Sequence, residues 1–258
     1  AIQPGQRTVQ GVLEDALHVL FRYPVRTTVA GRTDAGVHAT GQVAHVDVPA
    51  AAWDAVAAVA VVRLAGLMPP DVRVRGVVPA APGFDARFAA LWRRYEYRLC
   101  DAPGGPAPSR RRFVAAVRSA LDEAAMARAC PGLVGLHDFA AYCHARPTGT
   151  TVRSIEELTV SRDGDEVVVA VRADAFCHSM VRSLVGALVA VGQGRRPPGW
   201  PAELLLRRDR AGEVHVAAAG GLTLVDVGYP PPQEYAARVA TTRATRQTQE
   251  VPWGFAGR

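Results

Sequence analysis

The sequence of 258 residues contains no lysine, and all 30 of its basic residues are arginines. Each cation is therefore a planar guanidinium, which suits phosphate groups and stacks on flat rings. The formal net charge is +6 and the isoelectric point is about 9.6. A surplus of this sign fits a polyanionic partner such as a nucleic acid, and it fits a solvated surface equally well.

Long apolar runs are also missing. The longest, from Ser183 to Val191, is half of the roughly 18 residues that a membrane-spanning helix needs. The first ten residues lack the apolar stretch of a secretory signal, so we expect none. A composition of 49% hydrophobic and 21% charged residues is that of a folded globular protein. We expect no membrane association.

Cysteine is scarce, with four residues far apart and no Cys-x-x-Cys pair. A disulfide framework is not expected in a chain of this length, and a reducing cytoplasm fits best. The pairs Cys143-His144 and Cys177-His178 raise the question of a metal site. Adjacent side chains of a strand point to opposite faces, so neither pair is expected to close on one ion. We expect buried cysteines and incidental histidines, and no metal.

Periodicity in the sequence predicts alternating helices and strands. Apolar residues at helical spacing predict helices over 9–20 (with Thr8 as N-cap), 51–67, 121–129, 176–191 and 201–207. Alternating or β-branched runs predict strands over 25–30, 42–48, 72–78, 92–99, 155–160, 166–173 and 222–227. Asp163-Gly164 is expected to form the turn of a hairpin, and 135–139 is expected to be a loop.

This order of elements predicts an α+β protein with helices on one face of a mainly antiparallel sheet. We expect two units, 1–83 and 84–230, followed by a polar segment, 231–258, that forms an extended tail.

The segment Gly31-Arg32-Thr33-Asp34-Ala35-Gly36-Val37-His38 carries the clearest chemical signal. Its glycines allow a ligand to approach the backbone, and in an extended loop Arg32 and Asp34 can face the same cleft. An ordinary turn with a surface ion pair accounts for these residues equally well.

Four ordered motifs, in a match running from residue 8 to about 230, resemble the tRNA pseudouridine synthase A family. The Asp34 segment and its continuation through Val43 resemble the family signature. The other motifs are Phe84-Asp85-Ala86-Arg87-Phe88 with Arg94-Tyr95-Glu96-Tyr97, then Phe176-Cys177-His178-Ser179-Met180-Val181-Arg182, and the closing Gly221-Leu222-Thr223-Leu224-Val225.

The resemblance implies roles for four residues. Asp34 matches the catalytic aspartate, Arg182 the arginine paired with it, Tyr95 the tyrosine that meets the target base, and Arg32 an arginine that holds the target nucleotide out of its stack. It also implies two ferredoxin-like units with joined sheets and a basic cleft between them. The family works as a homodimer on uridines of the tRNA anticodon stem-loop (tRNA positions 38, 39 and 40), without metal or organic cofactor.

Departures from the family pattern also appear. The first strand and its aromatic-Gly-Trp element are absent ahead of Thr8, Ser183 replaces the usual asparagine, and 101–121 matches nothing. Two other functions stay open: a non-catalytic RNA-binding module, and a phosphoryl-transfer enzyme that uses Asp34 covalently. No second acid or phosphate loop accompanies Asp34, which weighs against the latter.

Overall fold

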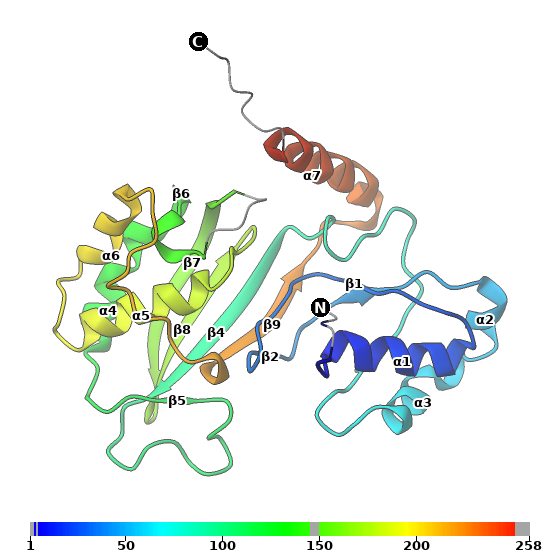
Figure 1. Cartoon of the computed structure of the whole chain (residues 1–258), viewed down its shortest axis with the longest axis horizontal. Helices are drawn as coiled ribbons and strands as arrows, with labels where there is room; N and C mark the ends of the chain where they lie inside the picture. The colour runs from blue at the N-terminus through cyan, green and yellow to red at the C-terminus, as the bar shows by residue number, and fades with distance from the viewer. Residues whose placement is uncertain (1–2, 4, 145–149, 251–258) are drawn as a thin grey trace. The chain divides into compact units, whose positions relative to one another are not determined.

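The computed structural model describes residues 3, 5–144 and 150–250 (Figure 1). The chain divides into two compact units. Unit 1 contains the described residues up to Arg32 together with Val43–Ala89 and Pro231–Val239, and unit 2 contains Thr33–Gln42, Ala90–Pro230 and the residues after Val239.

Unit 1 is built around α1 (Val9–Phe21), whose N-terminus is capped by Thr8, as predicted: the Thr8 hydroxyl accepts a hydrogen bond from Gly11 N at 3.1 Å. A two-stranded antiparallel sheet pairs β1 (Thr28–Val29) with β3 (Ala44–His45). Both strands are much shorter than the predicted runs 25–30 and 42–48.

The predicted helix over 51–67 is wrong as a continuous element. It is divided into α2 (Ala50–Asp54), the 3₁₀ turn η1 (Ala57–Val59) and α3 (Ala60–Leu67). The backbone leaves helical angles at Val56 and Val59, where β-branched side chains weaken the helix. The break lets Val56, Ala60 and Leu64 all enter the core against α1.

The predicted strand over 72–78 is also wrong. The segment is extended, with Val72 and Val74 packed against the core and Arg73 and Arg75 exposed, but it forms no ladder in the described part of the chain. Alternation shows which side chains are buried, whereas a strand also needs a neighbour with free backbone groups.

Unit 2 holds a mixed, mostly antiparallel seven-stranded sheet that does not close into a barrel. Its path is β2–β9–β4–β8–β7–β6, and β5 pairs with β4 off this path. Among the described strands of this sheet, only β2–β9 and β4–β5 pair in parallel. The strands are β2 (His38–Ala39), β4 (Trp92–Cys100), β5 (Ala115–Ala116), β6 (Gly135–Asp138), β7 (Val152–Asp163), β8 (Glu166–Ala173) and β9 (Leu222–Gly228).

The sequence predicted the centre of this sheet and missed its edge. Strand β4 and the β7–β8 hairpin, with Gly164 at φ +59° in its turn, are confirmed. The expected loop over 135–139 is instead the edge strand β6, which pairs with β7. A four-residue strand at an edge is too short to show a period.

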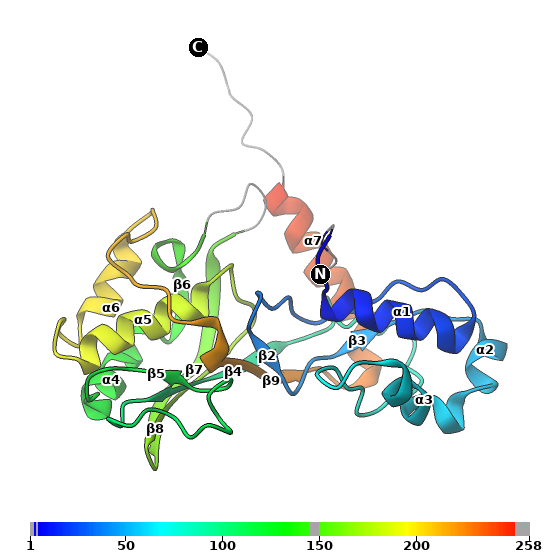
Figure 2. The same cartoon turned by 60° about the horizontal axis from the view of Figure 1, so that its bottom comes forward.

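Helices α4 (Glu123–Ala129) and α5 (Met180–Gly192) pack on each other and lie on one face of this sheet (Figures 1 and 2). The same face of β4 presents Tyr95, Tyr97 and Leu99, all buried. The short helix α6 (Trp200–Glu203) continues as the 3₁₀ turn η4 (Leu204–Leu206), and further 3₁₀ turns are η2 (Pro131–Leu133), η3 (Ala140–Tyr142), η5 (Ala219–Gly221) and η6 (Pro232–Glu234). None of the helices in the described ranges combines the length and apolarity needed to cross a bilayer.

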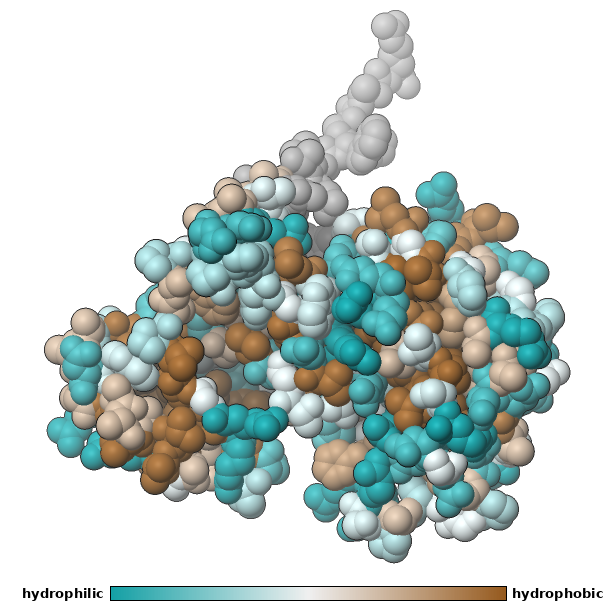
Figure 3. Space-filling model, turned by 180° about the vertical axis from the view of Figure 1, so that it is seen from behind, coloured by the Kyte–Doolittle hydropathy of each residue, from teal (hydrophilic) through white to brown (hydrophobic). Residues whose placement is uncertain are grey.

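The expected extended tail is wrong over most of its length. Residues Tyr235–Glu250 form helix α7, and 251–258 lie outside the described residues. A polar segment has no apolar periodicity to predict a helix, but its alanines and arginines are strong helix formers. Large apolar side chains are exposed elsewhere, among them Val62, Val78, Leu136 and Leu206. On the face drawn in Figure 3, hydrophobic and hydrophilic side chains are interspersed.

Candidate active site

Asp34 lies in a turn that is anchored to the sheet of unit 2. Its carbonyl accepts a hydrogen bond from Val37 N at 3.1 Å, and the chain then enters β2. Beyond β2, Gly41 N donates to Leu224 O on β9 at 3.2 Å. A Cβ at position 41 would lie 2.0 Å from Val225 O, so only glycine allows this close approach.

Arg182 lies in the first turn of α5, and its guanidinium reaches Asp34. Its Nη1 is 3.5 Å from Asp34 Oδ2, while its Nε donates to Ala217 O at 2.7 Å. The Arg182 carbonyl in turn accepts from Ala217 N at 3.1 Å. The Arg182 and Asp34 side chains are 20% and 34% exposed. The main chain at Ala217 therefore orients the guanidinium, which places a positive charge beside a partly dehydrated carboxylate.

Tyr95 forms an aromatic wall with Phe176 at the same site. The two rings meet edge to face, with centroids 5.1 Å apart. Burial raises the pKa of Tyr95 to about 12; the Arg93 charge lowers it and the Asp34 charge adds to the rise. The phenol is consequently protonated near neutral pH.

Tyr97, which follows on the same face of β4, is a core residue. It is 1% exposed, and its hydroxyl donates to Ala218 O at 2.7 Å. Burial also raises the pKa of Tyr97 to about 12. Its position beneath Ala218 supports the packing of the segment that holds Arg182.

Two further arginines, Arg110 and Arg73, have partners within the protein. Arg110 Nη2 lies 2.8 Å from Glu166 Oε2, and Arg73 donates to main-chain carbonyls that include Met68 O. Hydrogen bonds from Arg110 and then Arg98 lower the pKa of Glu166, against the effect of burial. Arg32 is exposed and belongs to unit 1, whereas Asp34, Tyr95 and Arg182 belong to unit 2.

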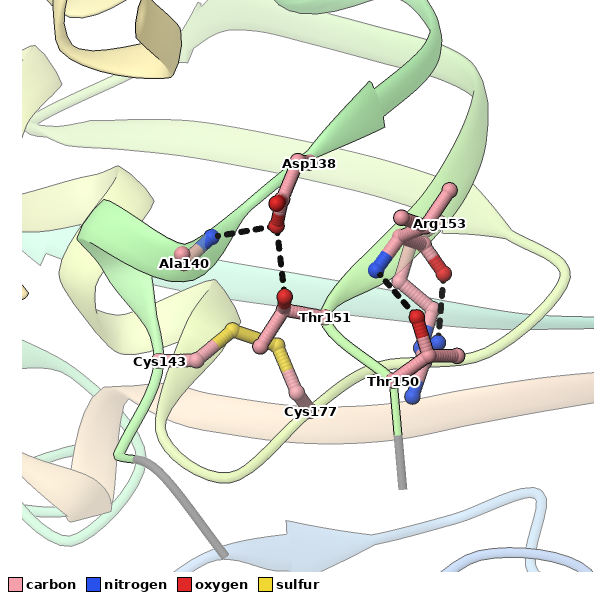
Figure 4. The surroundings of a disulfide bond; sticks show 8 residues. Asp138, Ala140, Cys143, Thr150, Thr151, Arg153 and Cys177 are labelled. Atoms are coloured by element: carbon pink, nitrogen blue, oxygen red, sulfur yellow. Dashed lines mark hydrogen bonds between the residues drawn. A yellow bond between two sulfur atoms is a disulfide. The ribbon is translucent and has the colours of Figure 1, made fainter. Parts of the chain in front are cut away.

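Sequence reasoning missed a cluster that joins the two Cys-His pairs. Cys143, just after η3, and Cys177, in the loop before α5, form a disulfide across 34 residues (Figure 4). The rings of His144 and His178 lie 5.0 Å apart, and His178 Nε2 is 3.5 Å from Asp34 Oδ1. The expectation that these cysteines form no disulfide is therefore wrong, whereas the expected burial of Cys143 is confirmed.

The error has a simple cause. Each Cys-His pair was judged alone, and no local pattern shows that two loops meet with Cα atoms 5.8 Å apart. Within the described ranges, no three or more histidine, cysteine or acidic side chains form a group that could hold a metal ion.

The other two histidines near the motif have structural partners. His45 Nδ1 accepts from Ala86 N at 2.9 Å, and His38 Nε2 lies 2.6 Å from Arg112 O.

Comparisons with known proteins find relatives over most of this chain. The family model described as tRNA pseudouridine synthase matches residues 129–230. The protein named tRNA pseudouridine synthase A of Frankia casuarinae is 59% identical over 95% of this chain and 89% of its own length. The proteins of the same name of Streptomyces griseus and Mycobacterium leprae are 51% and 48% identical, over 95% and 96% of this chain and 88% and 90% of their own lengths.

Proposed function

Because the chain belongs to the tRNA pseudouridine synthase A family of isomerases, we propose that it converts uridine to pseudouridine at positions 38, 39 and 40 of the tRNA anticodon stem-loop, with Asp34 as the catalytic carboxylate. The observation that carries the assignment of Asp34 is the Arg182 guanidinium 3.5 Å from its carboxylate, beside a buried Tyr95 whose pKa the Asp34 charge helps to raise. The positions in tRNA rest on the resemblance of the motif that contains Asp34.

The reaction breaks the C1′–N1 bond, turns the uracil and joins C5 to C1′. The proton on C5 is released, and N1 gains a proton. An ionised, poorly hydrated carboxylate is suited to add covalently to the sugar or base, and Arg182 stabilises its charge as water is excluded. The Tyr95 ring offers the detached uracil a surface on which it can turn without escaping.

Binding requires that the target base leave its stack, which costs a few kcal/mol. Arginine contacts to phosphates offset this cost, and the net charge of +6 supports such contacts. We assign Arg32, from its match to the family motif, to holding the extruded nucleotide.

Assembly and location are part of the same proposal. The strand order β9–β4–β8–β7, with α4 following β4 and α5 following β8, is that of a ferredoxin-like β-α-β-β-α-β unit. This order supports a ferredoxin-like fold for unit 2. We further propose a cytoplasmic homodimer. Light scattering at micromolar concentration tests the dimer, and a monomer would contradict it.

The alternatives make opposite predictions. An RNA-binding module without activity would bind tRNA more tightly once Asp34 is replaced, because an acid repels phosphates. A phosphoryl-transfer enzyme would need Mg²⁺, so pseudouridine formation that persists in EDTA excludes it. The family assignment favours the isomerase over both.

The site of modification is tested with tRNA transcripts that keep one uridine of the anticodon stem-loop at a time, at position 38, 39 or 40, or at a control position outside this set. Product is mapped by chemical labelling of pseudouridine and primer extension. We expect product at each of the three positions and none at the control. Product at the control position alone would refute the proposed specificity.

A further inference from the structure

The second oxygen of the Asp34 carboxylate has a neighbour of its own. Arg182 Nη1 lies 3.5 Å from Oδ2, and His178 Nε2 lies 3.5 Å from Oδ1. Both donors come from one stretch of chain, His178 from the loop before α5 and Arg182 from the first turn of the helix. Each carboxylate oxygen thus faces a different nitrogen.

The backbone of His178 is fixed by its surroundings. Its carbonyl accepts a hydrogen bond from His144 N at 3.1 Å, and the next residue, Ser179, has a left-handed conformation with φ +64°. Ser179 then begins the helix, with its carbonyl accepting from Ser183 N at 2.9 Å. The Cys143–Cys177 disulfide ties the preceding residues together (Figure 4).

The imidazole ring of His178 is also confined. It packs against the His144 ring at 5.0 Å between centroids, with an interplanar angle of 39°. The segment before His144 is anchored in turn, since Asp138 Oδ1 accepts hydrogen bonds from Ala140 N at 3.1 Å and from the Thr151 hydroxyl at 2.5 Å (Figure 4). A side chain held from its backbone and along its ring has few orientations left.

Asp34 is the acidic group beside the His178 ring. Among the described residues, Asp34 and His144 lie beside the His178 ring, and the Arg210 and Arg182 charges act on His144. Burial lowers the pKa of His144, and the Arg210 and His178 charges lower it further, against Asp34, so His144 is neutral near pH 7. His178 consequently has one acid beside it and a neutral ring behind it.

We propose that His178 is a positioning residue for Asp34: its Nε2–H donates to Oδ1 while Arg182 contacts Oδ2, which holds the carboxylate in one orientation toward the target nucleotide. The proposal rests on the proposed function of Asp34. The role is that of a donor at a fixed point, and it does not require His178 to gain or lose a proton. A carboxylate that reacts covalently gains rate from such orientation, since a small misplacement of reacting atoms is costly.

Two substitutions separate the donor from the shape of the ring. His178→Gln places an amide N–H near the position of Nε2, whereas His178→Phe keeps a flat ring and removes the donor. His137→Phe is the matched control, because His137 also lies in unit 2 and binds only the carbonyl of Val134 among the contacts recorded for its ring nitrogens. Single-turnover rates at saturating protein and tRNA affinity are measured for each variant, together with thermal unfolding.

We expect His178→Phe to lower the single-turnover rate about 10- to 100-fold, the range for loss of one hydrogen bond to a charged group. The tRNA affinity and the unfolding temperature should stay at the parental values, and His178→Gln should restore most of the rate. An unchanged rate in His178→Phe overturns the proposal, as does an equal loss in both variants, or a loss that appears only in tRNA affinity. Activity of Asp34→Asn would instead refute the assignment of Asp34, so the two failures are distinguishable.

Discussion

Replacing Arg182 by methionine removes the guanidinium beside Asp34 while it keeps an unbranched side chain on α5. The charged atoms are 3.5 Å apart, and both side chains are largely buried at 20% and 34% exposure. Two unit charges at this distance attract by about 1 kcal/mol in water and by about 5 kcal/mol at an effective dielectric constant of 20. These limits correspond to rate losses of about 7-fold and about 3,000-fold if the charge pair is needed in the transition state. Because the site is intermediate between them, we predict a loss of about 100-fold.

A second substitution separates charge from geometry. Arg182→Lys keeps the positive charge and loses the Nε hydrogen bond to Ala217 O that orients the guanidinium. Its activity should fall between those of the parent and Arg182→Met. The control is Arg195→Met, which removes an exposed arginine just beyond the other end of α5.

The assay is tritium release from tRNA that carries 5-³H-uridine, under single-turnover conditions with each variant at the same concentration. Arg195→Met should match the parent. An Arg182→Met rate within about threefold of the parental rate would refute the electrostatic argument, since even full solvent screening predicts a loss of about 7-fold.

Three further predictions concern stability. Cys143→Ser removes the disulfide to Cys177, which closes a loop across 34 residues, and should lower the free energy of unfolding by about 3–4 kcal/mol. Urea unfolding of this variant should not respond to reductant, and equal stability of the parent with and without reductant would contradict the prediction. Ser183→Ala should leave the free energy of unfolding unchanged or raise it by about 1–2 kcal/mol in urea titrations, because the Ser183 hydroxyl is buried without a hydrogen-bond partner among the described residues. A clear loss of stability would show that the hydroxyl has a partner. Burial raises the pKa values of Tyr95 and Tyr97 to about 12, so the contribution of each protonated phenol to folding stability is complete below about pH 10. This contribution, about 2–3 kcal/mol for each residue, is lost as the pH rises toward 12. Urea midpoints that stay level from pH 9 to 11.5 would contradict the burial of these phenols.

The fold shows which sequence patterns are sufficient to predict a helix or a strand. Helix α1 and the β7–β8 hairpin were predicted because a local period, an N-cap and a turn pair all agree. Strand β6 and helix α7 were missed because one is too short to show a period and the other has no apolar stripe. The run at 72–78 has the alternation of a strand but forms no ladder in the part of the chain that the structure describes, and pairing is a property that its own residues do not encode.

In the candidate site, too, the sequence identified some residues but not the contacts between them. Asp34 and Arg182 were found through family motifs, and their contact spans 148 residues that no periodicity could connect. His178 belongs to the family motif that ends at Arg182, but no local sequence pattern indicated that its ring would reach Asp34. No local pattern indicated the Cys143–Cys177 disulfide either. Long-range contacts between loops are set by how the sheet and helices pack, and they become visible only in three dimensions.

Tritium release from 5-³H-uridine tRNA by Asp34→Asn tests whether Asp34 performs the isomerisation. Asp165→Asn, at an exposed position of the same unit, is the matched control. We expect release by the parent and by Asp165→Asn, and none by Asp34→Asn at unchanged tRNA affinity. Release by Asp34→Asn at the parental rate would contradict it.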